Sequence, residues 1–143
     1  MAEGVFNDLI EKEKLSHKVT CDSAGTSNYH IGERADRRTL QVLDEKGIAL
    51  PHLGRQLQLS DFDNFDYILA MDANNYDDIN RLAQNKNDYK AKVLLMRHFD
   101  SSQSEKDVPD PYYGGIEGFY EVYHIVKDAS EGLIKFLKQK HKI

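Results

Sequence analysis

The sequence has one cysteine, three prolines and no tryptophan among its 143 residues. A single cysteine excludes an internal disulfide, so an apolar core must hold the fold together, and the composition fits a reducing compartment. No apolar run is long enough to span a bilayer, and no signal-type segment is present. We therefore expect a cytoplasmic protein with no membrane partner.

Positive charge is also scarce, with 19 Lys and Arg against 24 Asp and Glu and a formal net charge of -5. Nucleic-acid binding depends on clustered Lys and Arg, so this balance argues against a nucleic-acid partner. The basic residues that do cluster are expected to lie on solvated helix faces: Arg34, Arg37, Arg38 and the segment 135–142. The histidines show no metal-ligand spacing, and we predict neither a metal nor a cofactor.

A balance of 40% hydrophobic and 30% charged residues is typical of a globular domain. No linker or repeat is long enough to divide the chain, which is predicted to form a single domain over residues 1–143. Apolar periodicity predicts helices at 2–14, 35–46, 72–83 and from Phe119 to Phe136, and strands at 18–21, 65–71 and 91–96. Strands and helices that alternate in this way predict an α/β layered domain.

Two of the predicted strands, 65–71 and 91–96, are almost continuously apolar, as expected for a parallel sheet covered on both faces. Such sheets bind ligands at the carboxyl ends of their strands. Ser23, Asp72 and Asp110 each come after a predicted strand. The sequence therefore predicts that these three side chains share one site.

Residues 108–115 read VPDPYYGG and form the most informative segment of the chain. The flanking prolines hold Asp110 on a stiff arm, because proline fixes its own φ and favours an extended preceding residue. A rigid carboxylate beside Tyr112 and Tyr113 suits the donation of a proton to an aryl oxygen as it leaves phosphorus. Taken alone, the segment is equally compatible with a turn capped by aromatic residues.

Further motifs accompany this segment, and their order along the chain resembles the low-molecular-weight protein tyrosine phosphatase family over nearly the whole sequence. The motifs are DSAGTS at 22–27, Gly32 with Asp36, Arg37 and Arg38, Arg55 with Gln56, and DNFDYILAMD at 63–72. The resemblance implies a three-layer sandwich around a four-stranded parallel sheet. It also implies hydrolysis of phosphotyrosine or aryl phosphate monoesters through a cysteinyl-phosphate, without a cofactor.

The resemblance implies roles for residues 108–115, which we call the acid loop, and for its aromatic residues. Asp110 is expected to be the general acid that protonates the leaving phenol and then activates water. Tyr112, Tyr113 and Tyr29 are expected to line the slot for the substrate ring, which favours a phosphotyrosine-containing protein or a small aryl phosphate as partner. Half-buried packing is the ordinary alternative for Tyr29.

Three other residues are expected to support a phosphate-binding loop. By resemblance, Ser23 and His52 hold this loop by hydrogen bonds, and Asp72 orients its arginine. From the residues alone, Ser23 is equally well explained as the cap of a turn, and His52 as an ordinary loop histidine.

The phosphate-binding loop itself is not in the sequence. Family members open with a strand, a Cys-x5-Arg loop and Ser-Pro, whereas residues 1–6 already resemble the helix that follows. The chain is thus expected to lack the first strand of the sheet and to be inactive as written. Three explanations stay open: an internal methionine of a longer protein, a strand borrowed by swapping, or a non-catalytic remnant.

Cys21 is not expected to replace the missing nucleophile. It lies in a predicted strand next to the anionic Asp22, and Ser27 stands where the loop would require an arginine. A reactive thiolate needs a lowered pKa, usually from a helix N-terminus and a nearby cation. We interpret Cys21 as a structural thiol.

Three other classes of function are alternatives to the phosphatase. A non-catalytic phosphatase-like binding or regulatory module would keep the aromatic slot without the phosphate grip. An arsenate reductase of related fold would need several redox cysteines, and this chain has one. A phospho-acceptor receiver domain is disfavoured because no acidic pair for magnesium is evident near an early strand. The sequence does not predict the oligomeric state.

Overall fold

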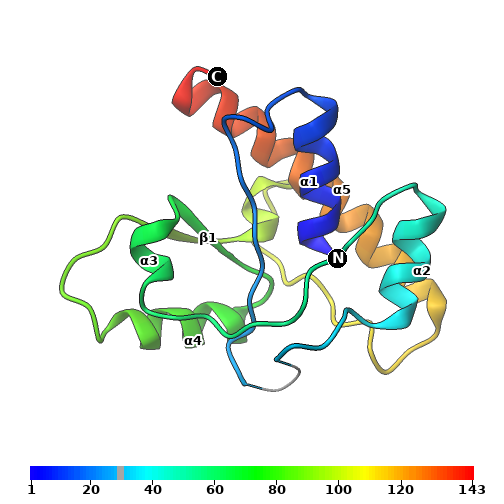
Figure 1. Cartoon of the computed structure of the whole chain (residues 1–143), viewed down its shortest axis with the longest axis horizontal. Helices are drawn as coiled ribbons and strands as arrows, with labels where there is room; N and C mark the ends of the chain where they lie inside the picture. Colours follow the sequence, from blue (N-terminus) through cyan, green and yellow to red (C-terminus); the bar gives the residue numbers. More distant parts are fainter. Residues whose placement is uncertain (29–30) are drawn as a thin grey trace.

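The computed structural model describes residues 1–28 and 31–143 (Figure 1). In chain order the elements are α1 (Ala2–Lys12), α2 (Arg37–Glu45), α3 (Asp61–Asn64), β1 (Tyr67–Ala70), α4 (Ala73–Ala83), β2 (Lys92–Leu95), the 3-10 helix η1 (Met96–Phe99) and α5 (Ile116–His141). β1 and β2 pair in parallel, with Tyr67 opposite Lys92 and Ala70 opposite Leu95. The predicted α/β class is confirmed.

The sheet lies between two layers of helices, and its side chains alternate between them. On one face, Leu69 and Leu94 pack in the cluster that α1 and α5 provide. On the other face, Ile68 and Val93 pack against the cluster of α3 and α4. Figure 1 shows these two helix pairs on opposite sides of β1. Because both faces are apolar and covered, the strands read as continuous apolar runs in the sequence.

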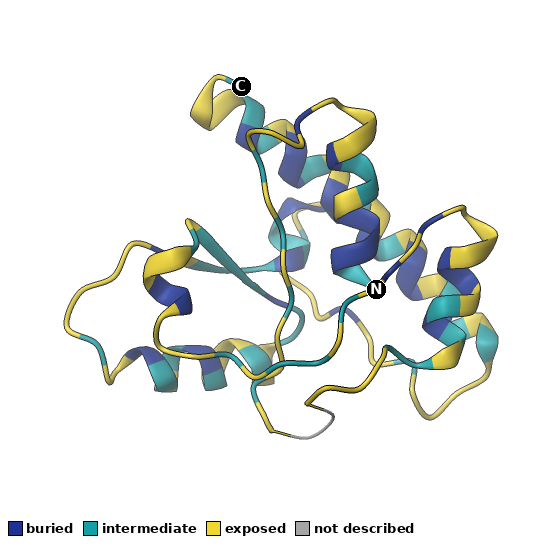
Figure 2. Cartoon of the chain, viewed as in Figure 1, coloured by how far each residue is buried: buried dark blue, intermediate teal, exposed yellow. Residues whose placement is uncertain are grey.

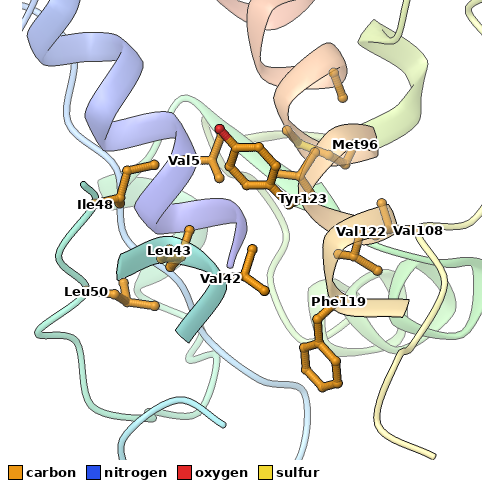
Figure 3. Packing of buried hydrophobic residues seen from close by; sticks show 12 residues of the cluster. Val5, Val42, Leu43, Ile48, Leu50, Met96, Val108, Phe119, Val122 and Tyr123 are labelled. Carbon is orange, nitrogen blue, oxygen red and sulfur yellow. The ribbon is translucent and has the colours of Figure 1, made fainter. Parts of the chain in front are cut away.

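A second part of the core joins α1, α2 and α5 (Figure 3). Val42 and Leu43 of α2 are fully buried here, against Val5 of α1 and Phe119 of α5. Figure 2 shows buried positions where α1 and α5 face each other. α2 ends at Glu45, and Gly47, predicted to terminate it, follows the C-cap Lys46 with a φ of +73°, the left-handed conformation that glycine adopts without strain. None of the helices in the described residues has the length and apolarity needed to cross a bilayer.

The strand predicted at 18–21 does not form. Residues 19–24 are irregular, and the sheet of the described residues contains β1 and β2 instead of the three strands predicted for this chain. Beyond this segment, Gly25 makes an isolated parallel bridge to Gln56. Apolar spacing favours extended backbone but cannot supply a partner strand, which has to come from elsewhere in the chain.

Asp100 stabilises the segment that follows η1. Its carboxylate is 4% exposed and accepts hydrogen bonds from the backbone N (2.9 Å) and the Oγ (2.6 Å) of Ser104. Arg97 Nε and Ser102 Oγ donate to it at 3.0 and 3.1 Å. Burial alone would raise the pKa of Asp100, but these donors outweigh burial and hold the pKa well below its usual range.

We predict that Asp100→Asn lowers the free energy of unfolding by about 2 kcal/mol near pH 7. A carboxyl group whose pKa is lower in the folded state stabilises the fold above its unfolded pKa of about 4, and this contribution is lost as the pH falls toward the folded value. The stability difference between parent and variant, measured by urea unfolding, should therefore shrink below about pH 4. The exposed Asp88→Asn is the control, and a pH-independent difference at Asp100 would contradict the prediction.

Gly132 marks the closest approach between α5 and η1. A Cβ at this position would lie 1.8 Å from the carbonyl oxygen of Phe99, closer than any non-bonded contact allows. We predict that Gly132→Ala lowers the free energy of unfolding by about 2 kcal/mol, although alanine is the better helix former. Gly118→Ala in the same helix is the control, because its Cβ would lie 3.4 Å from Pro111 Cβ. Equal urea midpoints for the two variants would contradict the prediction.

Candidate active site

A cavity of about 1310 Å³ lies beside β1 and reaches the carboxyl end of the sheet. The start of α1, the irregular segment 18–26, β1 and the residues from Val108 to Tyr112 line it. Its lining includes five of the predicted site residues, which come from four separate segments of the sequence: Ser23, His52, Asp72, Asp110 and Tyr112. Ser23, Asp72 and Asp110, the three residues predicted to share one site, all line this cavity.

The acid loop is attached at its base to the end of β1. Val108 N donates to Met71 O at 2.7 Å, directly before the Pro-Asp-Pro sequence begins. The Asp107 carboxylate accepts from Ala73 N at 2.9 Å, and Arg97 Nη1 donates to Asp107 O at 3.1 Å. These bonds explain why a loop that follows β2 returns to β1.

Asp110 lies in a tight turn at the edge of the cavity. Its side chain is exposed, and its Oδ1 accepts from Tyr112 N at 3.0 Å. The Tyr112 and Tyr113 rings meet edge to face with their centroids 5.0 Å apart. Tyr112 lines the cavity, whereas Tyr113 is 92% exposed and does not. Tyr29, the third predicted aromatic, lies outside the described residues.

Glu3 links the two predicted loop-supporting residues. Ser23 Oγ donates to Glu3 Oε1 at 2.7 Å, and His52 Nδ1 lies 3.2 Å from the same oxygen. His52 Nδ1 is also 3.1 Å from Asp22 Oδ1. We did not predict a role for Glu3 from the sequence. The sequence does show an acidic residue next to the apolar positions of the first helix. In the structure Glu3 is 9% exposed.

Among the described residues, three of these side chains are close enough together to be considered as metal ligands. Ligand atoms of Glu3, Asp22 and His52 lie within 4.8 Å of one another. Hydrogen bonds from Ser23 and the contacts of His52 already satisfy these oxygens. The geometry is therefore explained without a cation, and we assign no metal.

Arg55 extends this network along the lining of the cavity to Asp61. Its Nε donates to Asp22 Oδ2 at 2.9 Å, and its two terminal nitrogens donate to Asp61 at 2.9 and 3.1 Å. Burial would raise the pKa of Asp22, but the backbone N–H of Ser23 and the Arg55 guanidinium outweigh burial and lower this pKa. Asp22 is therefore held as an anion beside His52.

Asp72 takes the N-cap position of α4. Its Oδ1 accepts from Asn75 N at 2.7 Å, which satisfies one of the free donors at the start of the helix. The bond fixes the carboxylate at the carboxyl end of β1, on the lining of the cavity.

Cys21 also lines the cavity, in surroundings that disfavour a thiolate. Burial, followed by the negative charges of Glu3 and Asp22, raises the pKa of Cys21 to about 12. Nucleophilic thiols require the opposite shift. The structure therefore agrees with the interpretation of Cys21 as a structural thiol.

The fold is that of an α/β protein with a cavity at the carboxyl ends of two parallel strands. Over residues 1–143 the sequence matches the family described as low molecular weight phosphotyrosine protein phosphatase. The phosphatase of that name from Schizosaccharomyces pombe is 46% identical over 136 residues, which cover 94% of this chain and 86% of the relative. The chain belongs to this family, and the resemblance drawn from its motifs is confirmed.

Solved structures support the same assignment. A protein tyrosine phosphatase from Entamoeba histolytica superposes with a TM-score of 0.87 at 40% identity, covering 99% of this chain and 89% of that one. DARP, a Drosophila arginine phosphatase, superposes with a TM-score of 0.90 at 29% identity, covering 96% and 88%. These relatives favour a phosphatase over the receiver domain and the arsenate reductase.

We predict that Cys21 reacts at least about a hundredfold more slowly with iodoacetamide near neutral pH than the same thiol in the urea-unfolded chain, because the folded state disfavours the thiolate. Mass spectrometry of the alkylated fraction over time measures both rates. Similar rates in the folded and unfolded chain would contradict the prediction, and a faster rate in the folded chain would show an activated thiol and reopen its role as a nucleophile.

Proposed function

We propose that this chain provides the general acid and the aromatic rim of a protein tyrosine phosphatase that acts on phosphotyrosine or aryl phosphate monoesters. The observation that carries the proposal is the single cavity shared by Asp110, Tyr112, Ser23 and His52. The phosphatase names of its relatives support the reaction class.

The reaction proceeds in two displacements. A cysteine thiolate attacks phosphorus and forms the S–P bond while the P–O bond to the aryl group breaks, and the protonated Asp110 gives its proton to the leaving oxygen. The Asp110 carboxylate then takes a proton from water, whose oxygen attacks phosphorus and releases phosphate and the thiolate.

The thiolate and the arginine that grips the phosphate belong to a Cys-x5-Arg loop, which these 143 residues do not contain. We therefore propose that the chain as printed does not turn over. Ser23 and His52 would hold such a loop through the Glu3 network, and Asp72 would orient its arginine. Tyr112 and Tyr113 would form the rim of the slot, together with Tyr29 on the strength of the resemblance. We also propose that the protein acts in the cytoplasm.

A non-catalytic phosphatase-like binding or regulatory module is the second candidate. It is favoured by one observation: the chain forms a cavity with an aromatic rim but contains no nucleophile. A phosphotyrosine-specific module would bind phosphotyrosine peptides and leave them intact even when a complete phosphate-binding loop is added.

Activity is tested on the extended chain, which is residues 1–143 preceded by a strand and a Cys-x5-Arg loop of the family's type. We predict that the extended chain hydrolyses a phosphotyrosine peptide, whereas residues 1–143 alone do not. Phosphoarginine is assayed beside it, since one structural relative is an arginine phosphatase. Preference for phosphoarginine would replace the proposed substrate class, and binding without hydrolysis would favour the module.

The role of Asp110 is tested by leaving-group dependence. In the extended chain, Asp110→Asn should slow phenyl phosphate hydrolysis by about a hundredfold or more, because phenolate leaves poorly without a proton. Hydrolysis of 4-nitrophenyl phosphate should slow far less, since nitrophenolate is a stable anion. The exposed Asp88→Asn serves as the control. Equal losses for both substrates would remove Asp110 from the acid role.

A further inference from the structure

Arg38 is the one residue of the expected solvated basic cluster that contacts the acid loop in the described part of the chain. Within residues 1–28 and 31–143, the exposed neighbour Arg37 makes no hydrogen bond or ion pair, whereas the Arg38 side chain is 32% exposed and turns toward residues 112–114. Arg38 is thus only partly solvated, because it also bonds to partners that lie 74 and 76 residues away in the sequence.

The guanidinium of Arg38 is first fixed by the helix that carries it. Asp36 is the N-cap of α2, and its Oδ1 accepts from Arg38 N at 2.8 Å. The same carboxylate accepts from Arg38 Nε at 3.2 Å and from Nη2 at 3.1 Å. A bidentate pair of this kind sets the plane of the guanidinium as well as its position.

The remaining donors hold the backbone of the acid loop. Arg38 Nη1 donates to Gly114 O and Nη2 to Tyr112 O, each at 3.0 Å. The guanidinium carbon lies 4.4 Å from the centre of the Phe119 ring, at the start of α5, and 5.6 Å from that of Tyr112. One side chain thus joins the N-terminus of α2, the acid loop and the first turn of α5; Phe119 is drawn in Figure 3.

These contacts lead directly to the carboxylate of Asp110. Tyr112 accepts from Arg38 through its carbonyl and donates through its N–H to Asp110 Oδ1 at 3.0 Å. Arg38 therefore holds the peptide group between Tyr112 and Tyr113, and Asp110 holds the preceding one, between Pro111 and Tyr112. The base of the loop is attached separately, through Val108 N and Met71 O.

We infer that Arg38 is a positioning residue for the proton transfer. It holds the carbonyl of Tyr112, and the N–H of the same residue then fixes the orientation of the Asp110 carboxyl group. The inference rests on the proposed function of Asp110 as the general acid. Lysine keeps the charge but lacks the planar fork that reaches Asp36, Tyr112 and Gly114 together, so it should not substitute.

The test uses Arg38→Met, Arg38→Lys and the control Arg37→Met in the extended chain. Arg38→Met should slow phenyl phosphate hydrolysis by about tenfold and 4-nitrophenyl phosphate hydrolysis by less than about twofold, the pattern of a misplaced acid. Arg38→Lys should follow Arg38→Met, and Arg37→Met should leave both rates unchanged. A purely structural contact would slow both substrates alike, which would overturn the inference.

A double variant separates this inference from the proposed function. If Arg38 acts through Asp110, Arg38→Met should cost less than about twofold for phenyl phosphate in the Asp110→Asn background. A full tenfold cost in that background would overturn the inference and leave Asp110 as the acid. If Asp110→Asn itself shows no leaving-group dependence, the proposed acid role fails, and the positioning role of Arg38 fails with it.

Hydrogen exchange on residues 1–143 tests the contact independently of turnover. The amides of Tyr112 and Gly114 donate to Asp110 Oδ1 and to Pro111 O at 3.0 and 3.2 Å. Their exchange should accelerate by about tenfold or more in Arg38→Met and remain unchanged in Arg37→Met. Unchanged exchange in Arg38→Met would overturn the inference, since the loop would then hold its shape without the guanidinium.

Discussion

β1 and β2 run parallel and are covered by helices on both faces, so their carboxyl ends open at the same edge of the sheet. The positions of Asp72 and of the base of the acid loop follow from this pairing. β1 leads directly into Asp72 and α4, while the segment after β2 turns back and bonds to the end of β1 through Val108. A carboxylate from one loop and the N-cap of another helix therefore border one cavity, although they lie well apart in the sequence.

Charge-assisted hydrogen bonds then connect this edge with the helices around it. On one side of the cavity, Glu3 of α1 contacts Ser23 and His52. Asp22 contacts the same histidine and accepts a hydrogen bond from Arg55. On another side, the guanidinium of Arg38 connects α2 with the acid loop. In both cases a planar or branched polar group meets several partners, which fixes orientation as well as distance. The proposed chemistry requires such fixed orientations, because proton transfer depends on geometry.

The sequence predicted the elements that carry their own local pattern. The apolar runs at 65–71 and 91–96 became β1 and β2, and the three- and four-residue spacing from Phe119 to Phe136 falls within α5. The predicted strand at 18–21 failed because pairing depends on a partner that local spacing does not encode. Glu3 and Arg38 were missed as site residues for the same reason, since their partners are distant in sequence. The motif order supplied the candidate site residues, but not the bonds that join them.

We propose that this cavity is an aryl phosphate site with Asp110 at its edge. A crystal structure of the extended chain with benzylphosphonate, a non-hydrolysable analogue, would show where such a ligand binds. We predict that the phosphonate lies in the added loop beside Ser23 and His52, that the ring lies against Tyr112, and that Asp110 faces the position of the ester oxygen. A ligand bound elsewhere, or a ring turned away from Tyr112 with Asp110 out of reach, would show that the cavity is not this site.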